Sequence, residues 1–318
     1  MITVSHCDIF RTAVDWAAKG HEIALVTLVG IEGTSSRSPG TQMLVADNGR
    51  HIGSFSGGCI ENAIAKEALD VLADGRGRRV RYGLGSPYID IRLPCGGGID
   101  LLFTPGPDPA VLAQVAALLA ARQKAVLVID EHGVSMDAAS PGCRLTLIPQ
   151  LRILAFGQGE DLTAFAKLSA FYGALVEIMT PDPQEILGLT NHHVKVRHLH
   201  SRGQLPLLDG DPWTAIVFLF HDHDWEEFLL PDALVLPAFY WGAIGSTRTH
   251  QLRLEMLRRK GVHEEKVADM RGRIGLIPAT RDPATLALSI LGEIAAAYRV
   301  LLPGQPIVMF DTPGFAND

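Results

Sequence analysis

A strand, a glycine turn, a helix and a second strand follow one another in the second half of the chain, and this unit restricts the fold more than any other feature. An apolar run at 151–156 leads into a Gly-Gln-Gly turn at 157–159, a helical pattern follows at 161–173, and another strand pattern occupies 174–181. Further apolar strands alternate with helices toward the C-terminus. Because this alternation requires parallel strands joined by crossover helices, it predicts a doubly wound parallel sheet.

The first half of the chain has a different pattern, in which strands and helices do not alternate regularly. Segments 22–33 and 41–55 have the pattern of strands, the second folded around an Asp-Asn-Gly turn, and 60–75 has helical spacing with a glycine at its end. We therefore expect an α/β protein with two domains. They are a mixed α+β domain over residues 1–148 and a Rossmann-like doubly wound parallel-sheet domain over residues 149–318.

Composition and charge argue against several classes of protein. The chain of 318 residues has a formal net charge of −7 and no basic cluster, so no nucleic-acid partner is expected. Residues 1–20 lack the apolar core of a secretory signal, and apolar stretches are interrupted before the length of about 18 residues that a membrane span needs. The four cysteines form no Cys-x-x-Cys pair, which disfavours a disulfide framework. We expect a cytoplasmic protein with no membrane span.

Two of the cysteines stand beside consecutive glycines, and both sites are candidates for ligand binding. Cys59 is expected in the first turn of a helix, where exposed N–H groups and the helix dipole favour a thiolate, and glycines let the backbone approach a ligand closely. Glu61 could either cap the same helix or bind a polar group of a ligand. The alternative is that both cysteines are small buried residues beside turns. The first site comprises Ser56, Gly57, Gly58, Cys59 and Glu61, and the second comprises Cys95, Gly96 and Gly97.

The glycine turn of the second half matches the start of a dinucleotide-binding fingerprint. Gly157 and Gly159 follow an apolar strand and precede a helix, where a pyrophosphate could approach the helix N-terminus. However, Leu162 occupies the third small position, and Thr180 ends the next strand where a ribose-binding acid is usual. NAD(P) binding is therefore a weaker prediction than the fold, and another phosphate-bearing ligand is the alternative.

Three further segments place polar side chains where a ligand could bind. His221 ends an apolar strand within Phe-His-Asp-His-Asp-Trp, which is either a metal or ligand site or a polar loop. Gly245, Ser246 and Arg248 lie between a strand and a helix, where they could bind an anion or simply cap the helix. Arg37 lies in a polar segment that is either an anion-binding loop or a connection between strands.

Taken together, these motifs resemble the XdhC/CoxI family, the accessory proteins of xanthine dehydrogenase and related molybdenum hydroxylases. The resemblance includes the segments that contain Ser-Gly-Gly-Cys-Ile-Glu, Leu-Pro-Cys-Gly-Gly-Gly, Phe-Gly-Gln-Gly-Glu-Asp-Leu and Ile-Gly-Ser-Thr-Arg, in the family's order and over nearly the whole chain. Two positions depart from the family pattern. Glu160 follows the Gly-x-Gly turn where the family usually has histidine, and Thr180 replaces the strand-end aspartate.

The resemblance implies a role in cofactor maturation rather than in catalysis. Such a protein binds the molybdenum cofactor, retains it while a cysteine desulfurase supplies the terminal sulfido ligand, and transfers it to an apo molybdenum hydroxylase. It implies that Cys59 and Cys95 contact the molybdenum and that no residue is catalytic, and we expect a homodimer. A nicotinamide-dependent oxidoreductase, a cysteine-based sulfurtransferase and a docking protein for a hydroxylase are the alternatives.

Overall fold

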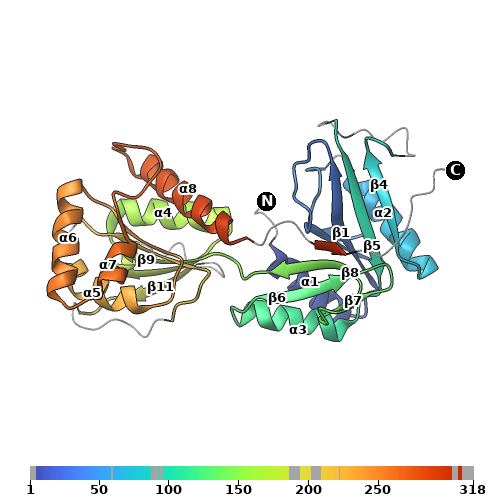
Figure 1. Ribbon diagram of the computed structural model, residues 1–318, viewed down its shortest axis with the longest axis horizontal. Helices are drawn as coiled ribbons and strands as arrows, with labels where there is room; N and C mark the ends of the chain where they lie inside the picture. The colour runs from blue at the N-terminus through green and yellow to red at the C-terminus, as the bar shows by residue number, and fades with distance from the viewer. Residues whose placement is uncertain are drawn as a thin grey trace. The chain divides into compact units, whose positions relative to one another are not determined.

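The computed structural model shows a chain that divides into two compact units (Figure 1). It describes residues 5–58, 60–86, 93, 96–185, 194–201, 209–221, 223–302 and 307–309. One unit comprises residues 4–149 together with 303–318, and the other comprises 150–302 together with 1–3. Residues 303–318 therefore group with the N-terminal unit, whereas the domain boundary expected at residue 148 assigns them to the C-terminal domain.

Within its described residues, the N-terminal unit contains two antiparallel sheets and three helices. The larger sheet has the strand order β3 (His51–Ile52), β2 (Gln42–Ala46), β1 (Ile23–Glu32), β5 (Gly98–Pro105) and β4 (Arg78–Gly83). The smaller sheet has the order β15 (Ile307–Met309), β8 (Gly142–Leu147), β6 (Ala125–Ile129) and β7 (Val134–Ser135). The helices are α1 (His6–Ala18), α2 (Glu61–Asp74) and α3 (Pro109–Ala120).

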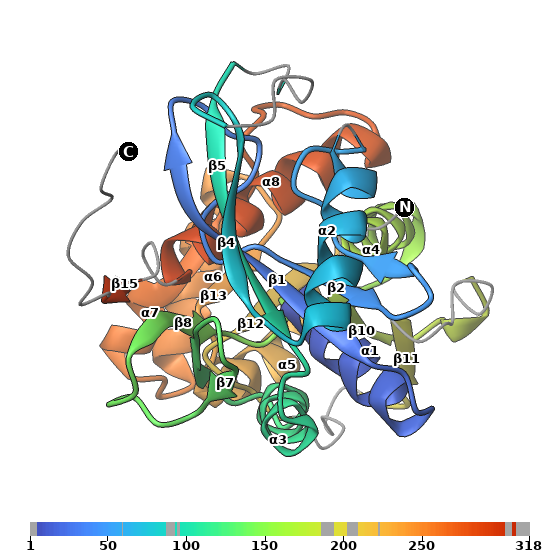
Figure 2. The same ribbon diagram turned by 90° about the vertical axis from the view of Figure 1, so that its right-hand side faces the viewer.

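Both faces of the larger sheet are buried, because helices or strands cover each of them. On one face, Leu25 of β1 packs with Phe10 of α1 and with residues of α3 and the smaller sheet. On the other face, Val26 packs with Ile64 of α2, and Figure 2 shows α2 beside β1 and β2. Successive side chains of a strand point to opposite faces, so β1, which is buried on both faces from Ile23 to Val29, supplies both cores.

The C-terminal unit is the predicted doubly wound parallel sheet. Its strand order is β11 (Val194–His198), β10 (Leu175–Thr180), β9 (Arg152–Gly157), β12 (Thr214–Leu219), β13 (Tyr240–Ala243) and β14 (Met270–Gly272). All neighbouring strands pair in parallel. The order reverses between β9 and β12, which is where open α/β sheets bind ligands beyond the carboxyl ends of their strands.

Helices cover both faces of this parallel sheet. Helices α4 (Gly159–Tyr172) and α8 (Pro283–Leu301) pack on one face, and α5 (His223–Val235), α6 (Thr247–Arg259) and α7 (Glu264–Asp269) pack on the other. A short 3-10 helix, η1 (Pro183–Glu185), follows β10. Of the helices described, α8 is long and apolar enough to cross a membrane. Ile290 and Ile294 of α8 are fully buried in the core formed with the sheet and α4, whereas Leu288 and Val300 of the same helix are exposed.

Candidate functional site

The two cysteine-glycine sites lie at one edge of the larger antiparallel sheet. At that edge, Glu32 at the end of β1 pairs with Gly98 at the start of β5, and Gly98 pairs with Gly83 at the end of β4. The loop that contains Cys95 therefore joins two strand ends at this edge. Gly53, which opens the Cys59 loop, passes so close to β2 that a Cβ there would lie 2.5 Å from the carbonyl oxygen of Gln42.

Residues 33–37, which follow β1, contact both of these loops. Ser36 Oγ donates a hydrogen bond to the carbonyl oxygen of Phe55 at 3.0 Å, and Arg37 Nε donates to that of Ser54 at 3.2 Å. On the other side, a Cβ built on Gly97 would lie 2.1 Å from the carbonyl oxygen of Thr34. Segment 33–37 thus brings together the residues flanking Cys59 and Cys95, although both cysteines themselves lie outside the described residues.

Three glycines of the two sites have backbone conformations that leave open space beside them. The φ angles of Gly57, Gly58 and Gly96 are 76°, 118° and 70°, in the region that L side chains rarely adopt. A Cβ on any of the three would meet no atom within 4 Å. The main chain is therefore uncovered at these three positions, which leaves room for the close approach of a ligand.

Glu61 is the most extensively hydrogen-bonded carboxylate among the described residues, and all of its partners belong to the loop that precedes it. Oε1 accepts hydrogen bonds from Ser54 Oγ and from the backbone N–H groups of Phe55 and Ser56 at 2.8–3.0 Å. Oε2 accepts from Ser56 Oγ and from the backbone N–H groups of Gly58 and Ile60 at 2.8–3.2 Å.

The hydrogen bonds to Glu61 outweigh the effect of its burial. The residue is 6% exposed, and burial by itself raises the pKa of a carboxyl group. The hydrogen bonds from Ser56 and Ser54 nevertheless lower the pKa of Glu61 to about 2. The residue is therefore ionised at neutral pH. Helix α2 begins at Glu61 with Ile60 at its N-cap, and the backbone N–H groups that this carboxylate accepts from belong to the preceding loop and to Ile60.

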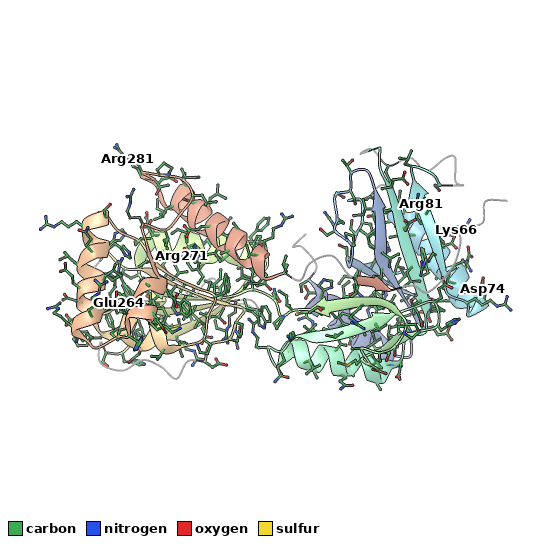
Figure 3. The ribbon with its side chains drawn as sticks, viewed as in Figure 1. Lys66, Asp74, Arg81, Glu264, Arg271 and Arg281 are labelled. Atoms are coloured by element: carbon green, nitrogen blue, oxygen red, sulfur yellow. The ribbon has the colours of Figure 1, made fainter. Side chains whose placement is uncertain are left out.

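A second set of charged groups at the same sheet edge was not predicted from the sequence. Arg81 of β4 (labelled in Figure 3) donates two hydrogen bonds to Asp100 of β5, at 2.7 and 2.8 Å, and one to Glu32 of β1 at 2.6 Å. These carboxylates raise the pKa of Arg81, with the hydrogen bonds that Arg81 donates to Asp100 as the largest cause. The ion pairs tie together the ends of three strands. In the sequence, the alternation of polar and apolar residues in β4 and β5 indicates which side chains share a face of the sheet. It does not identify Asp100 and Glu32 as the partners of Arg81.

The other two cysteines have surroundings unlike those of an open ligand site. Cys143 is fully buried in the core between the sheets, and burial raises the pKa of its thiol to about 11. Cys7 of α1 is partly buried and packs against the same core. Within the described part of the chain, no group of three or more His, Cys, Asp or Glu side chains could bind a metal ion.

In the C-terminal unit, a hydrogen bond spans the point where the strand order reverses. His221 Nε2, just after β12, lies 2.8 Å from Asp161 Oδ2 in the first turn of α4. The His221 side chain is 72% exposed, and the adjacent Glu160 is also exposed. Two carboxyl side chains at a helix N-terminus disfavour a pyrophosphate there, because both would repel it.

The remaining features of the predicted dinucleotide fingerprint have structural roles. A Cβ on Gly157 would lie 2.9 Å from the carbonyl oxygen of Leu219 on β12, so close strand packing requires this glycine. Leu162 is fully buried in the core beneath α4. Thr180 is also fully buried, and its hydroxyl accepts a hydrogen bond from the backbone N–H of Asp182 at 3.2 Å. Of the fingerprint glycines, only Gly159, with a φ of 76°, has open space beside it.

The predicted anion-binding turn after β13 is a capped helix start with an exposed arginine. Ser246 Oγ accepts a hydrogen bond from the backbone N–H of Thr249 at 3.1 Å, which caps α6. Gly245 has a φ of 136°, and a Cβ there would lie 2.9 Å from the Thr249 methyl group. Arg248 is exposed in the first turn. Nearby, Arg273 donates a hydrogen bond to the Thr247 hydroxyl at 3.1 Å, so two guanidinium groups lie near this helix end.

Comparison with known proteins matches both halves of the chain to one family. The model of the XdhC and CoxI family matches residues 16–83, and that of the XdhC Rossmann domain matches residues 153–294. The molybdenum cofactor insertion chaperone PaoD of Escherichia coli (strain K12) is 35% identical over 304 residues, covering 93% of this chain and 89% of that protein.

More distant relatives extend the comparison. The uncharacterized protein YqeB of Escherichia coli (strain K12) is 24% identical over 299 residues, which cover 90% of this chain and 46% of YqeB. The crystal structure of a protein described as a xanthine dehydrogenase from Bacillus halodurans shares the fold, with a TM-score of 0.70 at 20% identity over 93% of this chain and 96% of that one. On the evidence of the family matches and of the similarity to PaoD, the chain belongs to the XdhC and CoxI family.

Proposed function

We propose that this protein is a molybdenum cofactor insertion chaperone, which retains the cofactor during sulfuration and then transfers it to an apo molybdenum hydroxylase. The observation that most supports this proposal is the contact of segment 33–37 with both cysteine-glycine loops at one sheet edge. The similarity to PaoD, a molybdenum cofactor insertion chaperone, is the reason for proposing the molybdenum cofactor as the ligand.

The chemistry of the cargo matches the residue types at this edge. Molybdenum in a dithiolene complex is a soft metal centre, for which thiolates are suitable ligands, and Cys59 and Cys95 are the thiols that we assign to it. Gly57, Gly58 and Gly96 leave room for the pterin to approach the main chain. An open set of loops also suits a carrier, because its cargo has to leave again.

Arginine side chains are the proposed partners of the cofactor's phosphate. Arg37 is exposed and lies beside the Cys59 loop, where Nε and Nη1 donate to the carbonyl oxygens of Ser54 and Ser36. These bonds orient the guanidinium and leave Nη2 for a phosphate oxygen. In the other unit, Ser246 and Arg248 at the start of α6 form a second anion-binding position in this proposal.

The proposal includes two protein partners and assigns no catalytic residue. A cysteine desulfurase supplies the sulfur, the apo hydroxylase accepts the finished cofactor, and the chaperone acts as a cytoplasmic homodimer. Oxidoreductase activity with NAD(P) is the less favoured alternative, because Glu160 and Asp161 lie at the helix end where a pyrophosphate would bind. A sulfurtransferase would form a persulfide on Cys59 or Cys95.

The direct test is binding of molybdenum cofactor to the reduced protein under anaerobic conditions. We expect Cys59→Ala or Cys95→Ala to weaken binding by about tenfold or more, as the loss of one charge-assisted contact would. Cys7→Ala is the matched control and should bind as the wild type does. Absence of binding by the wild type, or equal binding by the Cys59→Ala and Cys95→Ala double variant, would refute the proposal. Saturable NAD binding, or one added sulfur on either cysteine by mass, would favour the alternatives.

A further inference from the structure

We infer that Glu61 is a positioning residue, which sets the shape of the loop containing Cys59 and does not itself contact the cofactor. The inference rests on the proposed function only in so far as Cys59 serves the cofactor. Its basis is the set of hydrogen bonds between this one carboxylate and the loop from Ser54 to Ile60.

Both oxygens of Glu61 are fully occupied. Each accepts three hydrogen bonds, all of them from the loop, whereas an ionised carboxylate offers about four lone-pair sites in total. The side chain is also buried, with 6% of the residue exposed. To bind a polar group of the cofactor, Glu61 would have to give up a donor from its own loop. This differs from the prediction that Glu61 contacts the cofactor directly.

The donors lie on both sides of Cys59 in the sequence. Phe55, Ser56 and Gly58 precede the cysteine, Ile60 follows it, and all four contribute backbone N–H groups. The two serine hydroxyls that donate to Glu61 also accept from the loop. Ser54 Oγ accepts from the N–H of Gly57 at 2.9 Å, and Ser56 Oγ accepts from the N–H of Ile60 at 3.2 Å. The described backbone N–H groups on either side of position 59 therefore bind the Glu61 carboxylate or the hydroxyls of Ser54 and Ser56, which themselves donate to that carboxylate.

Only an acceptor without hydrogens can satisfy this donor set. Glutamine has the same shape as glutamate, but its amide nitrogen would replace one carboxylate oxygen and present hydrogens to three donors. The low pKa of Glu61 shows the same preference for the ionised group. Consequently Glu61→Gln should lose the three hydrogen bonds that one of the two oxygens accepts, while the volume of the side chain stays unchanged.

The test compares Glu61→Gln with Glu67→Gln in the full-length protein. Glu67 is the matched control, because it lies in the same helix and accepts a hydrogen bond from Arg78 at 2.6 Å, away from the loop. We expect amide hydrogen exchange in residues 54–60 to become about tenfold faster or more in Glu61→Gln. The rate of Cys59 alkylation, followed by peptide mass spectrometry, should change by a similar factor. Glu67→Gln should match the wild type within about twofold in both measurements.

Binding of molybdenum cofactor then separates positioning from a general loss of stability. Ile64→Val removes one methyl group from the fully buried face of α2 and should lower stability without changing affinity, whereas Glu61→Gln should weaken binding by about tenfold. Unchanged exchange and alkylation in Glu61→Gln, or an equal loss of affinity in Ile64→Val, would overturn the inference. If the wild type binds no cofactor, the proposed function fails, and exchange and alkylation still decide the role of Glu61.

Discussion

Glu226 of α5 and Arg253 of α6 form a buried ion pair. Replacing either residue alone should lower the free energy of unfolding strongly, whereas replacing both with apolar residues should change it little. Arg253 Nε and Nη2 donate to the two carboxylate oxygens at 2.9 and 2.8 Å, and the side chains are 1% and 2% exposed. Arg253 Nη2 also donates to the carbonyl oxygen of Ile244 at 2.9 Å. The pair therefore lies directly beneath the turn that begins at Gly245.

The magnitude follows from this burial. Glu226→Gln leaves the guanidinium without a countercharge and almost without solvent, which costs about 3–5 kcal/mol of the free energy of unfolding. Arg253→Met removes the guanidinium from the buried Glu226 carboxylate and should cost a similar amount. The double variant Glu226→Leu with Arg253→Met removes both charges and fills much of the same space. It should be within about 2 kcal/mol of the wild type, because the desolvation penalty disappears together with the attraction.

Urea unfolding followed by tryptophan fluorescence can measure these changes in the C-terminal unit. A Trp16→Phe background removes the tryptophan of the N-terminal unit and leaves Trp213, Trp225 and Trp241 in the C-terminal unit. The midpoint should fall strongly in both single variants and recover in the double variant. Single variants that cost less than about 1 kcal/mol, as an exposed pair would, would refute the reasoning. So would a double variant as unstable as the sum of the two.

Two further predictions concern the N-terminal unit. Because the pKa of Glu61 is lowered from 4.5 to about 2, its contribution of about 3 kcal/mol to stability is complete above the unfolded-state pKa and is lost as pH falls toward 2. The stability difference between the wild type and Glu61→Gln should shrink by that amount on acidification, and a constant difference would contradict the assignment. Gly97→Ala should reduce cofactor retention and cost about 1–3 kcal/mol, since its Cβ would overlap a backbone oxygen. Gly133→Ala, which has open space, should cost much less in thermal unfolding.

The amino-acid sequence alone specified most of the fold of the C-terminal unit. Apolar runs at the length of strands, helical spacing between them and the glycine turn at 157–159 were sufficient, because periodicity and turn chemistry are local properties. The same local signals identified the glycines beside Cys59 and Cys95 as places of close approach. They also identified the helix start at Ser246, where the capping residue has a side chain that such a position favours.

The roles of individual site residues required the tertiary structure. Gly157 is needed for contact with Leu219, more than sixty positions later in the chain, and Asp161 meets His221 at a similar separation. Glu61 could equally have faced a ligand, and only the folded loop shows that its own backbone occupies the carboxylate.

What the sequence by itself determined was the order and type of most of the elements and the residue types available for the chemistry, but not helix α5, which begins at His223 directly after the segment interpreted as a polar loop. What the tertiary structure decided was which strand ends share an edge, that segment 33–37 contacts both cysteine-glycine loops, and that β15 returns to pair with β8 of the N-terminal unit. The physical reason is that periodicity and turn propensity act between near neighbours in the chain. Pairing between distant strands depends instead on the packing of all the elements together.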